Sequence, residues 1–542
     1  MPGGRSINNT SKYKRSDWIT TLTYDRKFWT RHNVKVLAGY EEIYTTLNGW
    51  GATRTGVTDP FFETYQGGWT SITASNNSQG ESGFKSYFSN LNYDFDNRYL
   101  VSASYRRDGY SGLPEANKYG NFFGGSVGWN ISEENFFQES SLNNIISYLK
   151  IRASYGQVGN INIGDFPSLG LYGSSTYAGI PTLGLSQAGN SNLKWETSNK
   201  SDIGFNISFL KGRLTIEADY YKNVIDGLVL DAKQAPSRGI PGNSISANVG
   251  SMYNQGIELT VNAQILNGKA FQWNANLNFS TLKNNVTALS GGSDIYVPSN
   301  FGIQNVTREG YSIGSIFAVP TTGVNPANGY RIFINSKGEQ VQYNHGGANK
   351  WTYVKDGSAA PAINNYTDGI IYGPSLPTYY GGFNNTLRYN DFDLNIGIVF
   401  SGGNKMYNGT RANLTDQRYF NNGAFILNRW TKPGQITDVP KLIYGDNVST
   451  GFSITNSAYV EDGSYVKLKN LSLGYRLPVQ QITRNAISSA RVYVQGSNLF
   501  TITKYRGSDP ESSINGNSID SGKDHNTVVN ASVLTFGINV GF

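Results

Sequence analysis

One pentapeptide has the residue types of a hydrolase nucleophile. Gly310-Tyr311-Ser312-Ile313-Gly314 matches G-x-S-x-G, a pattern that works on a strand-to-helix turn with an acid and a histidine later in the chain. Residues 316–319, Ile-Phe-Ala-Val, are typical of a strand, and no helix is predicted after them. The sequence therefore does not predict a hydrolase or any other enzyme, and we expect no catalytic residues.

Metal ligands are scarce in this chain. It has no Cys and three His, and His32, His345 and His525 lie far apart, without the i, i+4 spacing of a zinc-binding helix. Asp509 and Glu511, on either side of a proline, could offer two carboxylates to a cation, but calcium takes more oxygen ligands than that. An Asp-Pro pair is more typical of a turn. We expect no metal and no cofactor.

Aromatic residues in the long connections are the candidate ligand-binding residues. Their rings present apolar faces, and Tyr and Trp add a polar group, which suits stacking on sugar rings or on peptide side chains. An equally good interpretation is that these rings pack the connections together. The candidates are Trp50, Phe61, Phe62, Tyr65, Trp69, Tyr172 and Tyr177.

Composition and charge narrow the class of protein. Charged residues make up 15% of the 542 residues, and the net charge of +7 is spread along the chain without a Lys/Arg-rich block. Nucleic acid is therefore not an expected partner. No apolar run approaches the roughly 18 residues of a membrane helix, but a membrane-spanning strand needs only about 9–11 residues, half of them polar. No apolar signal segment follows Met1, so either the protein is not exported or its beginning is missing.

Alternation of apolar and polar residues is the strongest pattern. In residues 257–265, Ile, Leu, Val, Ala and Ile alternate with Glu, Thr, Asn and Gln, and residues 271–280 repeat the pattern after the turn Asn267-Gly268-Lys269. Period two predicts a strand with two different faces, and two such runs across a glycine turn predict a hairpin. A soluble β-sandwich would also alternate, but here the polar face is almost entirely Asn, Ser, Thr, Gln and charge, as in a barrel lumen.

About fifteen strands are predicted in this way. They cover residues 16–28, 32–44, 83–95, 98–107, 121–131, 148–158, 193–209, 213–222, 252–265, 271–282, 377–389, 392–401, 465–477, 491–501 and 532–542. Short connections alternate with long ones, as in an outer-membrane barrel with periplasmic turns and extracellular loops. The long connections are residues 45–82, 108–120, 159–192, 223–251, 283–376, 402–464 and 504–531. Bacterial barrels have even strand numbers, so an odd count with an extracellular start predicts the C-terminal part of a larger barrel.

Three local features refine this all-β, antiparallel transmembrane barrel. The apolar phase changes within residues 466–475, which predicts a bulge near Lys469 and Asn470, and Pro478 is expected to end that strand. Ser132 is predicted to cap a short helix in residues 132–144. Phe542 ends the last alternating run and resembles the C-terminal signal by which outer-membrane proteins are handed to the assembly machinery.

Several blocks resemble the SusC/RagA-type TonB-dependent outer-membrane transporters. The two most specific are YVEDGSYVKLKNLSLGYRLP at residues 459–478 and RVYVQGSNLFTITKYRGSDPE at residues 491–511. Weaker matches are FQWNANLNFSTLKNNVTALS, LPTYYGGFNNTLRYNDFDLNIGIVFSGGNKMYN, YLKIRASYGQVGN and the terminal SVLTFGINVGF. The resemblance covers essentially the whole chain, but only the C-terminal barrel portion of the family.

The resemblance implies a fold and a set of partners. Such transporters are similar in having a barrel of about 22 strands, a plug inside it and a TonB-contacting segment before the plug. We find no plug and no signal peptide in this sequence, and expect residues 1–542 to be the C-terminal portion of a TonB-dependent receptor-like β-barrel. The implied partners are outer-membrane lipid, a SusD-like surface lipoprotein, the TonB complex through the missing N-terminal region, and an oligosaccharide or peptide ligand.

The function that the resemblance implies is active import of an oligomeric nutrient, an oligosaccharide in preference to a peptide, across the outer membrane of a Gram-negative bacterium. One alternative is a passive porin-like channel, which would lack a plug. A second is a secreted all-β carbohydrate-binding or adhesion protein, which would be soluble without detergent. Oligosaccharide and peptide importers share the barrel motifs, so these motifs do not choose the substrate.

Overall fold

The structure is a computed structural model, and it describes eight stretches of the chain. These are residues 4–57, 68–161, 163–299, 302–418, 421–451, 453–479, 487–514 and 516–542. Three of the candidate ligand-binding residues, Phe61, Phe62 and Tyr65, lie outside the described residues.

The chain forms two compact units. Unit 1 contains Met1–Glu133, Arg152–Ser201 and Val224–Ser251, and unit 2 contains Glu134–Ile151, Asp202–Asn223 and Met252–Phe542. Because the boundaries between the units fall inside several long strands, these strands contribute residues to both units.

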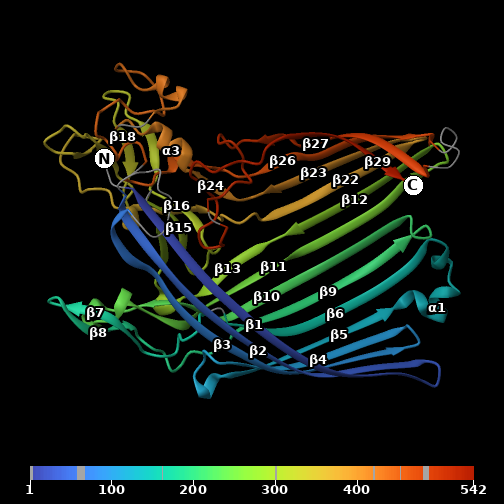
Figure 1. Ribbon diagram of the computed structural model, residues 1–542. Coiled ribbons are helices and arrows are strands. Elements are labelled where there is room, and N and C mark those ends of the chain that lie inside the picture. The colour runs from blue at the N-terminus through green and yellow to red at the C-terminus, as the bar shows by residue number, and fades with distance from the viewer. Residues whose placement is uncertain are drawn as a thin grey trace. The chain divides into compact units, whose positions relative to one another are not determined.

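Long antiparallel strands build the main sheet (Figure 1). In the order in which they pair, they are β1 (Arg5–Phe28), β2 (His32–Val57), β3 (Trp69–Phe95), β4 (Tyr99–Tyr110), β5 (Tyr119–Asn130), β6 (Ile146–Asn160), β9 (Glu196–Phe209), β10 (Leu214–Lys233), β11 (Ser244–Asn267), β12 (Phe271–Thr281), β22 (Tyr379–Tyr389), β23 (Phe392–Gly402), β26 (Tyr465–Leu477), β27 (Ser489–Thr503) and β29 (Val533–Gly541). The short strand β13 (Lys283–Ala288) pairs with β11. Each strand on the main path falls on a strand predicted from alternation, so the predicted all-β, antiparallel fold is confirmed.

Tight turns join the strands where the sequence predicts short connections. Asp96 and Asn97 between β3 and β4 have φ angles of 55° and 57°, the conformation of a two-residue hairpin turn and one that Asp and Asn tolerate. Asp96 also accepts a hydrogen bond from Arg31 Nη2 at 2.6 Å, which ties this turn to the turn between β1 and β2.

The first three strands of unit 1 are longer than predicted. β1 begins at Arg5, and β2 and β3 remain paired as far as Val57 and Trp69. Most of the predicted 45–82 loop is therefore strand. Thr, Gly and Asn occur on both faces of this extension, so it lacks the alternation by which the other strands were predicted.

Unit 1 has a small hydrophobic core in its connections. Leu193 is fully buried and packs with Tyr110, Leu113, Phe122 and Trp195. The indole N–H of Trp195 donates to the carbonyl oxygen of Lys118 at 3.0 Å, so this buried ring leaves no polar group unsatisfied. The connections also contain the hairpin β7 (Leu171–Tyr177) and β8 (Ile180–Gln187) and the 3-10 helices η1 (Glu115–Asn117), η2 (Ile131–Glu133), η4 (Pro236–Arg238) and η5 (Pro241–Asn243).

Unit 2 has folded sheets in connections that we predicted to be loops. One sheet contains β14 (Ile295–Ser299), β15 (Gly302–Thr307), β16 (Ser315–Ala318) and β21 (Ile370–Gly373), and a second contains β17 (Thr321–Val324), β18 (Arg331–Ile334), β19 (Gln340–Tyr343) and β20 (Trp351–Tyr353). A third contains β24 (Lys405–Asn408), β25 (Val460–Asp462) and β28 (Lys523–Asp524). We call the folded parts of residues 283–376, 402–464 and 503–531 the head.

Helices in unit 2 are short. They are α1 (Asn135–Gln138), α2 (Asn365–Asp368), α3 (Gly409–Thr415), and the 3-10 helices η3 (Ser141–Asn144), η6 (Ser290–Gly292), η7 (Ala424–Asn428) and η8 (Ser457–Tyr459). Ser132 is not the predicted cap, because residues 131–133 form a separate 3-10 turn and Glu134 occupies the N-cap of α1. In the described part of the chain, no helix is both long and apolar enough to cross a membrane.

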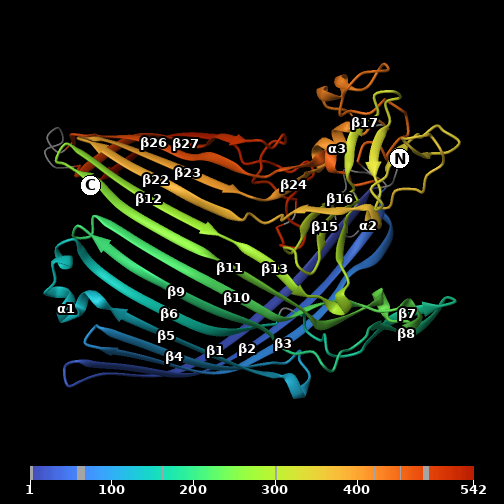
Figure 2. The ribbon, with the colours of Figure 1, turned by 180° about the vertical axis from the view of Figure 1, so that it is seen from behind.

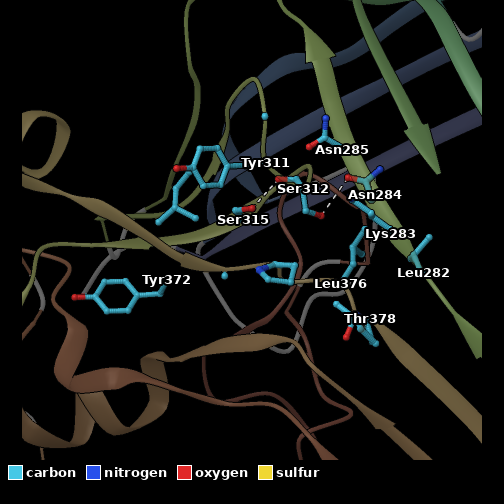
Figure 3. Close-up of a pocket in the computed structure, with 15 residues that line it drawn as sticks. Leu282, Lys283, Asn284, Asn285, Tyr311, Ser312, Ser315, Tyr372, Leu376 and Thr378 are labelled. Carbon is cyan, nitrogen blue, oxygen red and sulfur yellow. Dashed lines mark hydrogen bonds between the residues drawn. The ribbon is translucent and has the colours of Figure 1, made fainter. Parts of the chain in front are cut away.

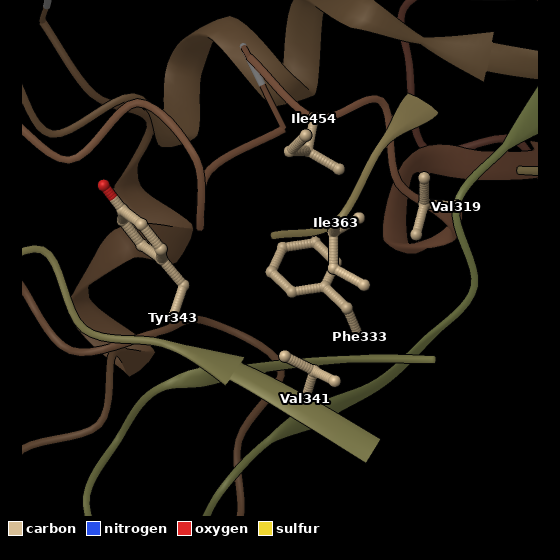
Figure 4. Close-up of a cluster of buried hydrophobic side chains, with 6 residues drawn as sticks. All are labelled: Val319, Phe333, Val341, Tyr343, Ile363 and Ile454. Carbon is tan, nitrogen blue, oxygen red and sulfur yellow. The ribbon is translucent and has the colours of Figure 1, made fainter. Parts of the chain in front are cut away.

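The largest core of the head joins residues that are far apart in the sequence (Figure 4). It contains Val319, Phe333, Val341, Tyr343, Ile363 and Ile454, of which Val319, Phe333 and Val341 are fully buried. Burial of one such side chain contributes on the order of 1.5–3 kcal/mol. A second core contains Ile303 and Val306 of β15 and Phe317 of β16. Figure 2 shows these two strands and α2 from behind. The predicted 283–376 loop is thus a folded body with its own cores.

The predicted bulge in β26 is present. The register with β27 shifts between Leu468 and Asn470, and the register with β23 shifts at the same place. β26 then ends at Leu477, immediately before Pro478, because proline cannot donate to the ladder. The bulge keeps the apolar residues on both sides of it on one face of the sheet.

Candidate functional site

The register of unit 1 sorts its side chains into two faces. Directly paired residues share a face, so rows of side chains run across β1–β5. On the face that we call outward, one row consists of Phe28, His32, Phe95, Tyr99 and Trp129. The ring centroids of Phe95 and Tyr99 are 6.2 Å apart, and those of Tyr99 and Trp129 are 6.5 Å apart. This row forms a continuous aromatic border at the tight-turn end of the sheet.

A second aromatic border lies farther along the same face. Trp18 and Tyr119 lie in one cross-strand row, and Tyr40 and Tyr87 pair in the adjacent row with centroids 5.3 Å apart. Between the two borders the outward residues are mostly apolar, including Leu22, Val34, Val36, Leu91, Val101, Phe123 and Val127. From Trp18 to Phe28 the strand has the length, about 9–11 residues, with which a tilted strand crosses a bilayer. We call this belt the membrane band.

Unit 2 has the same two-faced pattern. Its outward face contains rows such as Val261, Leu277, Phe383, Ile398, Leu468 and Phe500. Asn385 is an exception on this face, between Ala275 and Ile396. Its Oδ1 accepts a hydrogen bond from Trp273 Nε1 at 3.0 Å. Because an unsatisfied amide in an apolar environment is costly, this bond is what makes Asn385 tolerable there.

Amides and hydroxyls form rows on the inner face of unit 2. One row contains Asn274, Thr386, Asn395, Ser472, Gln495 and Thr535, and the Thr386 hydroxyl donates to Asn395 Oδ1 at 3.0 Å. In the neighbouring row, Asn276 Nδ2 donates to Asn262 Oδ1 at 2.6 Å. A hollow of about 270 Å³ opens on these rows. The surface is rich in hydrogen-bonding groups and contains few charges.

Some of the charges on the inner faces have ion-pair partners. In unit 2, Arg491 binds Asp393 through two bonds, Nε to Oδ1 at 2.8 Å and Nη2 to Oδ2 at 2.5 Å. The guanidinium lies over Gly474, where an added Cβ would collide with it, so a side chain at this position would have to displace Arg491 from its present place. In unit 1, Arg106 lies 2.6 Å from both Glu41 Oε2 and Asp108 Oδ1. Within each of these groups the opposite charges offset one another.

A pocket of about 500 Å³ opens in unit 2 where the head meets β12 and β22 (Figure 3). Tyr311 and Tyr372 lie on one side of it, and Lys283, Leu282 and Thr378 lie on the other. Burial raises the pKa of the Tyr372 hydroxyl. A lining that combines two aromatic rings with aliphatic and amide groups can stack on a flat ligand group and hydrogen-bond its edge.

One asparagine fixes the wall of this pocket. Asn284 Oδ1 accepts hydrogen bonds from the backbone N–H of Ile313 at 2.7 Å and from the Ser312 hydroxyl at 3.1 Å. Its Nδ2 donates to Asn254 Oδ1 at 2.8 Å. Ser312, the serine of the G-x-S-x-G match, lies in the turn between β15 and β16, and its hydroxyl donates to the amide oxygen of Asn284 on β13 rather than to a histidine.

The carboxylates of Asp509 and Glu511 form ion pairs with lysine side chains. Lys467 Nζ lies 2.9 Å from Asp509 Oδ1 and 2.5 Å from Glu511 Oε2, and Lys469 Nζ lies 3.3 Å from the same glutamate oxygen. Lys467 is only 2% exposed. The two carboxylates thus bind an ammonium group, in agreement with the turn interpretation that the sequence favoured over a calcium site.

The three histidines lie at three separate places. His32 Nδ1 contacts the Tyr93 hydroxyl at 2.9 Å, and His345 Nδ1 contacts the Tyr343 hydroxyl at 3.2 Å. Burial, followed by the nearby charge of Lys523, lowers the pKa of His525 to about 4. Among the residues that the structure describes, no three metal-ligating side chains gather in one place.

Trp50 and Trp69 lie on the extended strands rather than in a loop. Trp50 is 69% exposed and pairs with Thr10 and Asn77, which places it on the outward face. Trp69 is the first residue of β3 and pairs with Val57, in the row of the opposite face. These two candidates therefore do not form one binding surface.

Tyr172 and Tyr177 lie on the β7–β8 hairpin and are 70% and 80% exposed. The register places them on opposite faces of the hairpin, since Tyr172 pairs with Leu185 and Tyr177 with Ile180. Tyr172 shares its face with Leu183 and Leu185, so that face is apolar and exposed. Phe542 follows the end of β29 and is 93% exposed. Its role as an assembly signal stays a prediction, as does ligand binding by the aromatic candidates.

The residues of the pocket were missed by sequence reasoning. Asn284, Tyr311 and Tyr372 come from three segments whose proximity depends on the fold of the head. The only signal was the unusual G-x-S-x-G turn, which marks the pocket wall but predicted a different chemistry.

A family model described as TonB dependent receptor-like, beta-barrel matches residues 2–499. The chain belongs to this family. The TonB-dependent receptor family is one of the Gram-negative outer membrane, so the membrane band of unit 1 is a lipid-facing surface. The predicted outer-membrane location and the resemblance to SusC/RagA-type proteins are confirmed.

Individual proteins of the TonB-dependent receptor family are also similar to this chain in sequence and in structure. TonB-dependent receptor P3 of Formosa agariphila is 32% identical over 551 residues, 96% of this chain and 52% of that protein. TonB-dependent receptor SusC of Bacteroides thetaiotaomicron is 29% identical, covering 84% of this chain and 43% of that protein. A solved structure of the RagAB peptide transporter matches with a TM-score of 0.81 and 25% identity, over 99% of this chain and 56% of that chain. The chain spans about half the length of the curated relatives it matches.

Proposed function

We propose that the full-length protein containing this chain imports an uncharged, hydrogen-bonding oligomer across the outer membrane, with energy supplied through TonB. The inner face of unit 2 carries this proposal. Its rows of Asn, Gln, Ser and Thr can exchange hydrogen bonds with hydrated cargo, and the charges of Arg491 and Asp393 on it offset each other. Concentrating such cargo against a gradient needs an energy source that the outer membrane itself lacks.

The proposal includes closure of a larger barrel. β1 and β29 are the two ends of the strand order in the main sheet. In the full-length protein, further strands pair with these two edges and complete a barrel of about 22 strands, an even number like those of other bacterial barrels. Residues 1–542 form the C-terminal portion of that barrel.

A SusD-like surface lipoprotein is the proposed partner. The exposed apolar face of the β7–β8 hairpin, formed by Tyr172, Leu183 and Leu185, supports this assignment, because a two-stranded hairpin does not normally leave such a face to water. In the proposed complex the lipoprotein covers this face. Tyr172 then serves the partner contact, and ligand contact is left to the pocket.

An oligosaccharide suits the pocket and the inner face better than a peptide does. Tyr311 and Tyr372 offer rings on which a sugar can stack, and Asn285 and Thr378 offer an amide and a hydroxyl to its hydroxyl groups. Lys283 is the single charged side chain among the lining residues. A peptide carries two charged termini; Lys283 can pair with its carboxylate, but this lining offers no acid to its ammonium group.

Uptake by cells that carry or lack the gene tests the proposal. Cells with the full-length protein and its lipoprotein should accumulate fluorescent oligosaccharides, and deletion of the gene should abolish this accumulation while growth on the monosaccharide is retained. Tyr311→Ala with Tyr372→Ala should lower uptake at low oligosaccharide concentration, whereas exposed Tyr444→Ala, on a different part of the head, should not. Uptake of peptides of matched length instead of oligosaccharides would overturn the substrate class.

Energy coupling is tested separately. Removal of TonB should stop oligosaccharide accumulation in cells that still make the protein. Persistent uptake without TonB would favour the passive porin-like channel. Recovery of the full-length protein in the soluble fraction without detergent would favour a secreted binding protein.

A further inference from the structure

We propose that unit 1 holds phosphorylated glycolipid of the outer leaflet through four basic side chains that lie at the outer edge of the membrane band. The residues are Lys12 and Lys14 on β1, Lys85 on β3 and Arg107 on β4. The inference rests on the proposed orientation, with the extended ends of β1–β3 outside the cell.

The register places all four side chains on the outward face. Arg107 lies in the row of Tyr40 and Tyr87, and Lys85 lies in the next row, with Trp18. Neighbouring strands are about 5 Å apart and successive residues on one face about 7 Å apart, so Arg107 and Lys85 are near neighbours. Lys14 and Lys12 follow on β1, two and three rows beyond Trp18. The four residues therefore begin at the outer aromatic border and continue away from the apolar belt.

These four cations are available to a ligand. All four are exposed, and none forms an ion pair with a described residue. Arg107 lies over the Tyr119 ring at 4.8 Å, which orients its guanidinium without neutralising it. Two acids share this face: Glu42 lies directly across from Lys85, and Glu81 lies in the row of Lys14. Their carboxylates accept hydrogen bonds from the hydroxyls of Tyr40 and Tyr44, so the four cations and two acids leave a net charge of about +2 on this part of the face.

The opposite end of the membrane band differs in its charge arrangement. There, Arg31 lies 2.6 Å and Arg98 lies 3.6 Å from Asp96, and the Arg26 guanidinium stacks over Phe28. Arg31 and Arg98 beside the tight turns thus share Asp96 as an ion-pair partner, whereas none of the four cations at the extended end forms an ion pair with a described residue. The asymmetry matches a membrane whose outer leaflet is built of phosphorylated glycolipid.

Position identifies lipid as the ligand rather than a free anion. The cations adjoin a surface that lipid chains cover, so a lipid bound along Leu22 and Phe123 brings its headgroup to the height of Arg107 and Lys85. Basic side chains next to a membrane contribute to binding of anionic headgroups individually and add together. A free phosphate would gain the ionic contacts without the apolar ones and would bind much more weakly.

Lipid binding to the purified full-length protein tests this inference independently of transport. Bisphosphorylated lipid A added in detergent should raise the unfolding temperature, and monophosphorylated lipid A should raise it less. In a variant with Lys12→Gln, Lys14→Gln, Lys85→Gln and Arg107→Gln, affinity for bisphosphorylated lipid A should fall by about tenfold or more, because several charge contributions are removed together.

A matched variant removes the same number of positive charges from the inner face of β1 and β2. It carries Arg5→Gln, Arg15→Gln, Lys27→Gln and Lys35→Gln, which the register places in the opposite rows. This control should keep the affinity of the unmodified protein. Equal losses in both variants, no loss in the outward variant, or equal stabilisation by inorganic phosphate alone would each overturn the lipid site. Loss of lipid binding with intact oligosaccharide uptake would support the site and leave the proposed transport function standing.

Discussion

Lys467 Nζ lies 2.5 Å from Glu511 Oε2 in unit 2, and this contact ties β26 to the connection that follows β27. Asp509 of the same connection approaches the lysine to 2.9 Å. Lys467 is almost completely buried, so its charge depends on these two carboxylates. Removing one partner of a buried pair leaves an uncompensated charge, which typically costs about 3–5 kcal/mol.

Acid should loosen this connection. Burial alone would raise the pKa of Glu511, but hydrogen bonding and charge from Lys467 outweigh burial, and the pKa lies below its usual value of about 4.3. Because the pKa is lower in the folded state, the stabilisation is present above about pH 4.3 and is lost as the pH falls through the folded-state pKa. The protection of the amides of residues 503–514 against hydrogen exchange, relative to the intrinsic rate at each pH, should therefore fall in acid. Glu511→Gln should lower this protection at neutral pH already, whereas Asp356→Asn, in a separate turn, should not.

Charge on the two faces of β11 should have unequal effects. Leu259 pairs with Phe279 on the outward face, and Asn262 pairs with Asn276 on the inner face. Leu259→Arg should destabilise the barrel by about 2–4 kcal/mol if the residue lies near the bilayer midplane, and less near an interface. Asn262→Arg should assemble almost normally. Denaturant unfolding of both variants in lipid vesicles measures the difference, and equal losses would mean that the faces are assigned wrongly.

The hydrogen bond between Trp273 and Asn385 should be needed on the lipid-facing surface. Trp273→Phe keeps an aromatic ring but leaves the Asn385 amide unpaired, which should cost about 1–3 kcal/mol. Adding Asn385→Leu removes the unpaired amide and should restore most of that loss. Unfolding free energies of the two single variants and the double variant measure the coupling. Additive effects would show that the bond contributes nothing.

Cysteine labelling should separate the two ends of unit 2. The chain has no Cys, so an introduced thiol is unambiguous. Lys337→Cys, exposed in the head between β18 and β19, should react with a membrane-impermeant reagent on intact cells. Lys269→Cys, exposed in the tight turn between β11 and β12, should react only after the outer membrane is permeabilised. Equal labelling on intact cells would contradict the orientation.

Alternation predicted the main sheet because the membrane imposes it. Each residue on β12 faces either lipid or the inner side, so the apolar side chains of Trp273, Leu277 and Phe279 predict that these residues lie on the lipid-facing side. The extended ends of β1–β3 could not be predicted from alternation, because polar residues predominate on both of their faces. Where no lipid demands apolar residues, a paired strand and a polar loop have the same composition.

The head, and the ion pairs of Lys467 with Asp509 and Glu511, could not be predicted for a different reason. Strands such as β18 and β19 have four residues each, too few for a period to be recognised, and Phe333 and Ile454 meet in one core from segments far apart in the chain. The local spacing of Asp509 and Glu511 makes them candidate ligands of a metal cation. In the structure their carboxylates bind the ammonium group of Lys467, which lies on β26 and cannot be identified from local spacing.

The distance between the two aromatic borders of unit 1 determines the bilayer thickness that suits the protein. Rings such as Trp18 and Trp129 prefer the headgroup level, so their separation along the strands sets the thickness of hydrocarbon that the protein fits without strain. Bacterial outer membranes are thinner than average bilayers, and a mismatch costs fractions of a kcal/mol per Å, shared between protein tilt and local deformation of the lipid. Around this barrel the surrounding lipid would adjust its depth to the protein, and in thicker synthetic bilayers the protein should gather with other copies to reduce the deformed area.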